Sequence, residues 1–164
     1  MVLTPHAIIG AAVALQFPKH PILGFIFGFL SHFILDAIPH WHYSVLAIKE
    51  AKKLMSTKPF TGGRGALRDL TWIGGDFFLG IVISAVMATL TNPPAIFIAL
   101  LGAAGGVFPD FLQFAYFAIP KPPISTIYNF HMWIHAKKRL DDQPLIGISQ
   151  QLLLVAFGIL ITIF

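Results

Sequence analysis

The chain has 164 residues, of which 56% are hydrophobic and only 11% are charged, and its mean hydropathy is +0.77. Soluble domains carry about 25% charged residues, so lipid is the expected solvent for this chain. The absence of cysteine excludes disulfides and thiolate metal ligands. The net charge of +4 would suit nucleic acid, but the basic residues flank apolar segments. Because that pattern is typical of membrane proteins, no nucleic-acid partner is expected.

Five apolar segments have the length of helices rather than of strands. They cover residues 5–17, 21–38, 72–91, 94–119 and 145–164. The first is short and needs neighbouring helices or thin lipid to span a membrane. Residues 1–6 lack the basic region of a signal peptide, so we expect the first segment to belong to the mature fold. These features predict a single all-α domain, an integral membrane helix bundle of four or five spans.

Short turns join the apolar segments into two helical hairpins. The hairpins cover residues 5–38 and 72–119, and a single helix at 145–164 follows them. The two hairpins look alike, because His6-x3-Gly10 opens the first and Asp76-x3-Gly80 opens the second. This pattern favours an internal duplication; two unrelated hairpins are the alternative.

Two basic connections determine the predicted orientation in the membrane. Residues 43–70 contain a stretch, 43–56, that predicts an amphipathic interfacial helix, and residues 120–144 form a connection with two histidines. Both connections lie on the same side if each hairpin crosses the membrane twice. The positive-inside rule makes that side the cytoplasm of a cell inner or plasma membrane, and the N-terminus starts there too.

This topology brings eight ionisable residues from separate segments to the cytoplasmic end of the bundle. They are His6, His32, Asp36, His40, Asp76, Asp110, His131 and His135. His32 and Asp36 are one helical turn apart, as are His131 and His135. Pro39 is expected to end or kink the second helix and to let His40 or His42 turn back towards the cluster. His20 lies in the turn between the first two apolar segments, away from this end. The simplest interpretation of His42 is a solvated side chain near the site.

The eight residues form a candidate metal site. An isolated carboxylate in lipid costs about 2.5–3.5 kcal/mol on insertion scales, so the aspartates should face the interior and be paired. A cysteine-free set of nitrogen and oxygen ligands favours zinc, with manganese or iron as alternatives. Either one ion or two ions bridged by an aspartate fit the number of ligands. Such a site can polarise a phosphoryl oxygen and activate water; a purely structural metal site is the nearest alternative.

Several motifs resemble those of the inner-membrane metal-dependent hydrolases. They are Thr4-Pro5-His6-x3-Gly10, Ser31-His32-x3-Asp36-x2-Pro39-His40 and Gly105-Gly106-x2-Pro109-Asp110. The His32-x3-Asp36 pair is also similar to a ligand pair of the zinc-dependent phospholipase C superfamily. The resemblance implies a helical phosphoesterase acting on a lipid or another phosphoester, with His6, His32, Asp36 and Asp110 matching its pattern. Asp110 is not followed by the family's acidic and histidine residues, which leaves an inactive relative as an alternative.

Three further interpretations remain open at the level of sequence. A small transporter would use the aspartates as an ion path, but they gather at one end rather than at the midplane. A haem protein would use histidine pairs, but has no role for three buried aspartates. A structural or assembly protein needs no chemistry. The substrate and the oligomeric state do not follow from the sequence.

Overall fold

The computed structural model describes residues 2–43, 45 and 64–163, and this part of the chain is helical without any β-strand. Its six α-helices are α1 (Leu3–Leu15), α2 (Pro21–Asp36), α4 (Arg64–Thr91), α5 (Ile96–Ala118), α6 (Ile124–Ile134) and α7 (Pro144–Ile163). A single 3-10 turn, η1 (Pro93–Ala95), precedes α5. The predicted all-α bundle is thereby confirmed. The interfacial helix predicted at 43–56 falls almost entirely outside the described residues.

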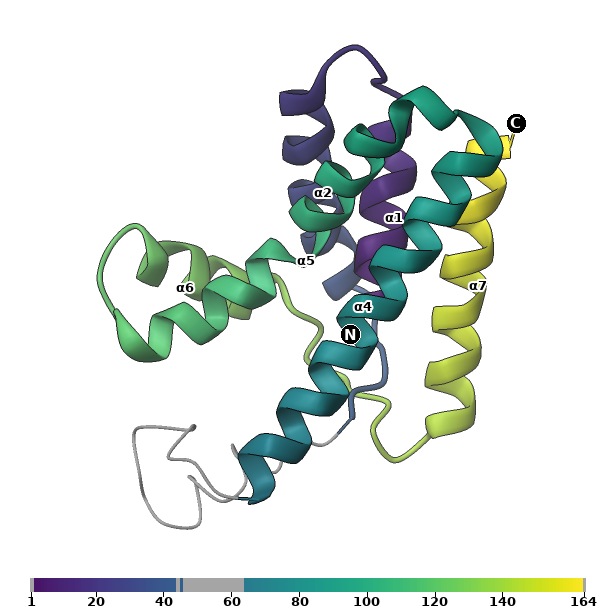
Figure 1. Ribbon diagram of the computed structural model, residues 1–164. Helices are drawn as coiled ribbons and strands as arrows, with labels where there is room; N and C mark the ends of the chain where they lie inside the picture. Colours follow the sequence, from purple (N-terminus) through teal and green to yellow (C-terminus); the bar gives the residue numbers. More distant parts are fainter. Residues whose placement is uncertain (1, 44, 46–63, 164) are drawn as a thin grey trace.

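Helix α1 is the centre of the bundle, and α2, α4, α5 and α7 all pack against it (Figure 1). Its sequence is almost free of polar residues, and ten of its 13 residues are buried. The core joins Ala7, Ile8 and Ala11 of α1 to Met87 of α4 and Ala103 of α5. A 13-residue helix is about 20 Å long. Longer helices enclose it, in agreement with the expectation that so short an apolar segment needs neighbouring helices.

Glycines allow α1, α2 and α5 to approach at backbone distance. A Cβ atom at Gly102 of α5 would collide with the backbone of Gly10 in α1, and one at Gly28 of α2 would collide with the carbonyl of Gly102. A Cβ at Gly106 would meet the carbonyl of His6. Small residues at such crossings are typical of helix packing in membranes. They bring the first turn of α1 and the last turn of α2 next to the middle of α5.

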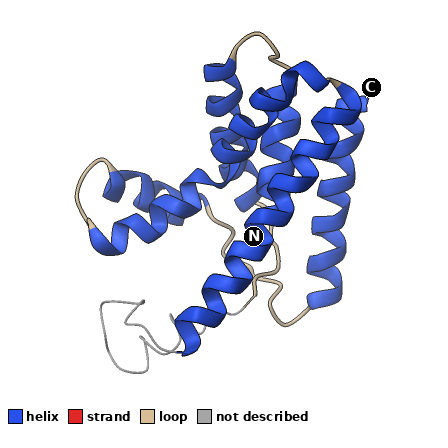
Figure 2. Ribbon diagram, viewed as in Figure 1, coloured by secondary structure: helices blue, strands red, loops and turns tan. Residues whose placement is uncertain are grey.

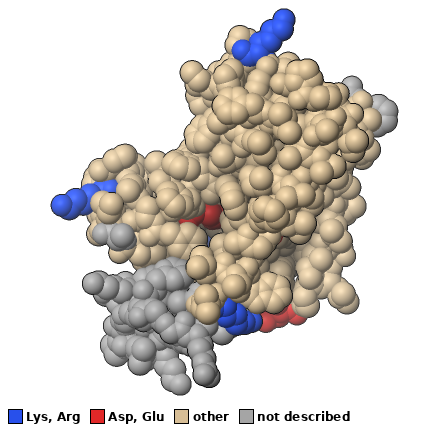
Figure 3. Space-filling view, in the orientation of Figure 1, with Lys and Arg blue, Asp and Glu red and all other residues tan. Residues whose placement is uncertain are grey.

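The outer surface of the bundle is apolar. Large exposed side chains include Ile34, Phe78, Leu90, Phe97 and Leu153, each more than 60% exposed. Hardly any charged atoms interrupt the bundle face seen in Figure 3. Among the described residues, three helical segments are long and apolar enough to cross a membrane: Leu67–Thr91, Pro93–Phe117 and Pro144–Ile163. Helices α1 and α2 are apolar but shorter, with 13 and 16 residues.

The second half of α5 and helix α6 form an arm that projects from the bundle (Figures 1 and 2). Pro109 lies inside α5, and α6 folds back along the second half of that helix. The sequence had indicated only a connection at 120–144, because α6 is short and amphipathic. The end of α6 and the chain after it return to the bundle, which brings His131 of α6 and His135 beyond it to the end of α2.

Candidate metal site

The carboxylate of Asp36 lies at the centre of a buried cluster of imidazoles. Asp36 is the last residue of α2 and is only 1% exposed. Five histidine Nε2 atoms lie within 3.9 Å of its two oxygens. These histidines are His6, His32, His40, His131 and His135, from α1, α2, α6 and the segments that follow α2 and α6. The structure therefore brings five of the predicted histidines together around a predicted aspartate.

Four residues, here called the Asp36 group, have ligand atoms that all lie within 4.8 Å of one another: His32, Asp36, Asp110 and His131. Asp36 Oδ2 is 3.2 Å from His32 Nε2 and 2.7 Å from His131 Nε2. The two Nε2 atoms are 3.3 Å apart. Neighbouring ligands of a tetrahedral ion with Zn–N bonds of about 2.0–2.1 Å are separated by roughly 3.3 Å. The spacing of these atoms therefore suits a cation of this size.

The tautomer of His32 also fits a cation. Its Nδ1 donates to the carbonyl of Gly106 over 2.7 Å, so in the neutral ring Nε2 has a lone pair. That lone pair faces the carboxylate of Asp36, and two acceptors at 3.2 Å need a proton or a cation between them. Metal-ligating histidines are usually held in this way through their other nitrogen. The side-chain amide nitrogen of Gln113 donates to His131 Nδ1 over 2.9 Å, so the proton of the neutral His131 ring lies on Nε2, which donates to Asp36 Oδ2 over 2.7 Å. This proton must leave before His131 Nε2 can bind a cation.

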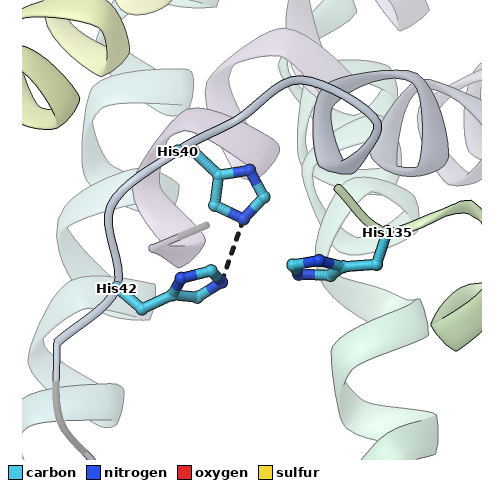
Figure 4. Close-up of side chains that lie close together, drawn as sticks. All are labelled: His40, His42 and His135. Carbon is cyan, nitrogen blue, oxygen red and sulfur yellow. Dashed lines mark hydrogen bonds between the residues drawn. The ribbon is translucent and has the colours of Figure 1, made fainter. Parts of the chain in front are cut away.

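A second set, here called the three-histidine group, lies next to the first and comprises His40, His42 and His135 (Figure 4). The chain leaves the helix after Asp36, and His40 turns back so that its Nε2 lies 3.5 Å from Asp36 Oδ1. This return is the one expected from Pro39. His40 is buried, whereas His42 and His135 are partly exposed. Burial lowers the pKa of His40 to about 3 and that of His42 to about 4, so both rings are neutral, as metal ligands must be.

His6 is the ligand candidate that α1 contributes to the cluster. Its ring stacks on that of His32 with a centroid distance of 4.0 Å. The side chain is fully buried, and neither of its ring nitrogens has a hydrogen-bond partner. Its Nε2 nevertheless lies 3.2 Å from Asp36 Oδ1. Buried polar atoms without hydrogen bonds are costly, so His6 is a further candidate ligand on the Oδ1 side.

Backbone hydrogen bonds hold the two non-helical segments of the site together. The N–H of Ala136 donates to the carbonyl of Asp36 over 2.7 Å, and that of Leu140 donates to the carbonyl of His40 over 3.1 Å. The N–H of His42 donates to Asp141 Oδ1 over 3.1 Å. The segment after α6 thus runs beside the segment after α2, and this pairing fixes the three-histidine group.

Tyr43 lies beyond this pairing, at the edge of the site. Burial raises its pKa, and the charges of Asp76, Asp110 and Asp69 raise it further. The phenol therefore stays protonated and is available as a hydrogen-bond donor near the carboxylates. The sequence offered no signal for this residue.

Asp76 lies apart from both groups. Its carboxylate accepts hydrogen bonds from the backbone N–H groups of Leu3 and Thr4, and from the hydroxyl of Thr4 over 2.6 Å. These groups are the unsatisfied donors at the start of α1. Asp76 thus caps a helix from a neighbouring one, in place of the ligand role that the sequence had suggested. The remaining predicted residues all have ligand atoms at or next to the Asp36 carboxylate.

His42, which the sequence placed near the site without assigning it as a ligand, also contacts the cluster, and so do Gln113 and Asp141, which the sequence did not single out. The segment around His42 is extended, so His40 and His42 share a face at a spacing of two, which was a usable signal. Gln113 lies one turn after Asp110 on α5, and this too was recognisable. Asp141 is far from His42 in sequence, and only the fold brings the two together.

The fold and the cluster together define a class: an apolar helical bundle with buried His/Asp groups that can hold a metal ion. Comparisons with family models, with curated proteins and with solved structures found no match to this chain.

Proposed function

We propose that the protein is a membrane-embedded, metal-dependent hydrolase of a phosphoester, acting at the cytoplasmic face of a cell inner or plasma membrane. The observation that supports this most strongly is the convergence of five histidine Nε2 atoms on Asp36. A structural core has no need of so many imidazoles around one carboxylate. The motifs shared with inner-membrane metal-dependent hydrolases agree with this proposal.

The residues of the Asp36 group would hold a divalent ion, with zinc favoured by its nitrogen and oxygen donors. Such an ion would polarise a phosphoryl oxygen and lower the pKa of water. In the reaction, the oxygen of water bonds to phosphorus, the ester P–O bond breaks, and the alcohol leaves with a proton. Asp110 is 21% exposed, so the group is reachable from one side. Figure 3 shows acidic atoms in a hollow beside the α5–α6 arm.

An anionic substrate suits the charges around this opening. Lys137, Lys138 and Arg139 follow His135 after a single alanine, and all three are exposed. Basic residues beside a membrane attract anionic head groups with about 1 kcal/mol each. They would bring a phosphoester towards the metal and balance its charge.

The arm supports a lipid as the source of that phosphoester. Helix α6 exposes Phe130, Met132 and Trp133, the last of them 75% exposed. Aromatic and apolar side chains on a short amphipathic helix are typical of a membrane interface. The arm would therefore lie where the head groups are.

A non-catalytic metal site in a structural protein is the alternative. It is favoured by the burial of His32, Asp36 and His131, each at most 1% exposed. A structural ion is usually enclosed by its ligands, whereas a catalytic one keeps an open position.

An activity assay separates the two. Protein reconstituted in phosphatidylglycerol vesicles and loaded with zinc should release an alcohol or phosphate from bis-p-nitrophenyl phosphate or from short-chain phosphatidic acid. Asp36→Ala should abolish this release, while His20→Ala, at the opposite end of the bundle, should keep it. Retention of metal with no turnover of either substrate class would favour the structural site instead.

A further inference from the structure

The three-histidine group has its own supporting contacts. His40 Nδ1 donates to the carbonyl of Ile38 over 2.6 Å, and His42 Nδ1 lies 3.3 Å from Asp141 Oδ1. Both contacts place the proton on Nδ1, so each Nε2 has a lone pair. The two Nε2 atoms nevertheless lie 2.9 Å apart. Figure 4 shows both turned towards one another, with His135 beside them.

Two neutral nitrogen lone pairs at that distance repel unless a proton or a cation lies between them. The spacing is about that of adjacent ligands in an octahedral ion with bonds of roughly 2.0–2.1 Å. His135 completes the set, because its ligand atom lies within 4.8 Å of the other two. Its Nδ1 is 3.2 Å from the carbonyl of Ala136. The proton is therefore placed on Nδ1, and the lone pair on Nε2 can bind a cation as well.

Asp141 adds a carboxylate behind the ring of His42. It accepts from the backbone N–H of His42 over 3.1 Å and faces the ring nitrogen at 3.3 Å. A carboxylate bound to the far nitrogen of a histidine is the usual support for a metal ligand, since it fixes the tautomer and raises basicity. An ordinary exposed histidine needs no such partner.

We propose that His40, His42 and His135 form a second cation site, which shares the carboxylate of Asp36 with the first and is oriented by Asp141. His40 Nε2 is 3.5 Å from Asp36 Oδ1, and His135 Nε2 is 3.9 Å from Asp36 Oδ2. The Asp36 carboxylate thus lies between the two groups and can bridge two ions, as in two-metal hydrolases whose ions are about 3.5–4 Å apart. The inference rests on the proposed metal function of the Asp36 group.

The ions in the two proposed sites should differ in how fast they exchange with the solution. The ring of His42 is 24% exposed, whereas His32 and His131 of the Asp36 group are buried. The second ion therefore has access to water and binds more weakly than the first. Three imidazoles and a carboxylate edge suit zinc, cobalt or manganese.

The number of zinc ions bound per chain tests this proposal. Detergent-purified full-length protein is stripped with a chelator, dialysed against zinc, and its bound zinc measured by elemental analysis. The wild type should hold two ions per chain, and His42→Ala and His42→Gln should each hold one. Asp142→Ala, an exposed carboxylate next to Asp141, should still hold two. Asp141→Asn should weaken the second ion by about 10–100-fold, as for other residues that orient a metal ligand.

Manganese gives an independent readout of the shared carboxylate. At two equivalents, the wild type should show an exchange-coupled electron paramagnetic resonance spectrum, and His42→Gln should show that of an isolated ion. One ion in the wild type, unchanged by both His42 variants, would overturn the second site but leave the proposed function standing. The loss of both ions in folded His42→Gln would also overturn it, because a single site would then be indicated. No ion at all would refute both proposals.

Discussion

At the scale of residues, Asp36 and Asp76 show how similar signals in the sequence lead to different roles. Both are aspartates in apolar segments: Asp36 is the last residue of α2, and Asp76 lies in the middle of α4. Asp36 is surrounded by imidazoles, while Asp76 is surrounded by the donors that begin α1. The hydrogen-bond partners of a carboxylate, and not its burial alone, therefore decide whether it can be assigned to a metal.

Substitution of Asp76 tests this distinction. Asp76→Asn should lower the free energy of unfolding by about 1–2 kcal/mol, because the start of α1 loses part of its cap. The metal content should stay at the wild-type value. Unfolding in sodium dodecyl sulfate followed by circular dichroism, together with elemental analysis, measures both. If the variant loses its metal at undiminished stability, Asp76 is a ligand as the sequence first suggested.

The spacing of ligands within one helix was predictable from the sequence, and their partners were not. His32 and Asp36 share a helix face by periodicity alone, and Pro39 correctly indicated the return of His40. The contacts of His42 with Asp141 and of His131 with Gln113 depend on how the segments after α2 and α6 fold. Periodicity contains no information about such distant pairings.

At the scale of elements, the glycine crossing of α1 and α5 determines where the ligands lie. It holds the first turn of α1, with His6, against the middle of α5. The short α6 then returns the chain to α2. The apolar pattern predicted the long helices well, because lipid imposes length and apolarity on them. It did not reveal α6, an 11-residue helix that depends on packing against α5.

The close crossing of α1 and α5 predicts that a single methyl group added at Gly102 lowers the stability of the protein strongly. Gly102→Ala places a Cβ against Ala14 and the backbone of Gly10, so the helices must separate. The free energy of unfolding should fall by about 1–3 kcal/mol, and bound metal should decrease with it.

Gly75→Ala is the matched control, because a Cβ there meets nothing within 4 Å. It should leave stability unchanged or raise it by up to about 1 kcal/mol, since alanine favours the helix. Equal effects of the two substitutions in the unfolding titration would contradict the close packing of α1 on α5.

At the scale of the whole molecule, the ligands gather near the start of α1 and the end of α2, and the α1–α2 turn lies at the opposite ends of these two helices (Figure 1). The proposed function has the ligand end facing the cytoplasm, an orientation expected from the positive-inside rule. The absence of cysteine allows a direct test, because any cysteine introduced is the single reactive thiol.

Lys138→Cys, near the site, should react with a membrane-impermeant maleimide only after the cytoplasmic side is opened. Lys19→Cys, in the α1–α2 turn, should react in intact cells. Labelling of both positions from the same side would contradict a bundle that crosses the membrane, and exchanged sides would reverse the orientation.

The metal content of the purified protein decides whether the cluster around Asp36 binds a metal ion. Elemental analysis of detergent-purified wild type should find at least one zinc, manganese or iron ion per chain. Asp36→Ala should contain almost none, and His20→Ala should match the wild type. A wild type without stoichiometric metal, or an Asp36→Ala variant that retains it in full, would contradict the account.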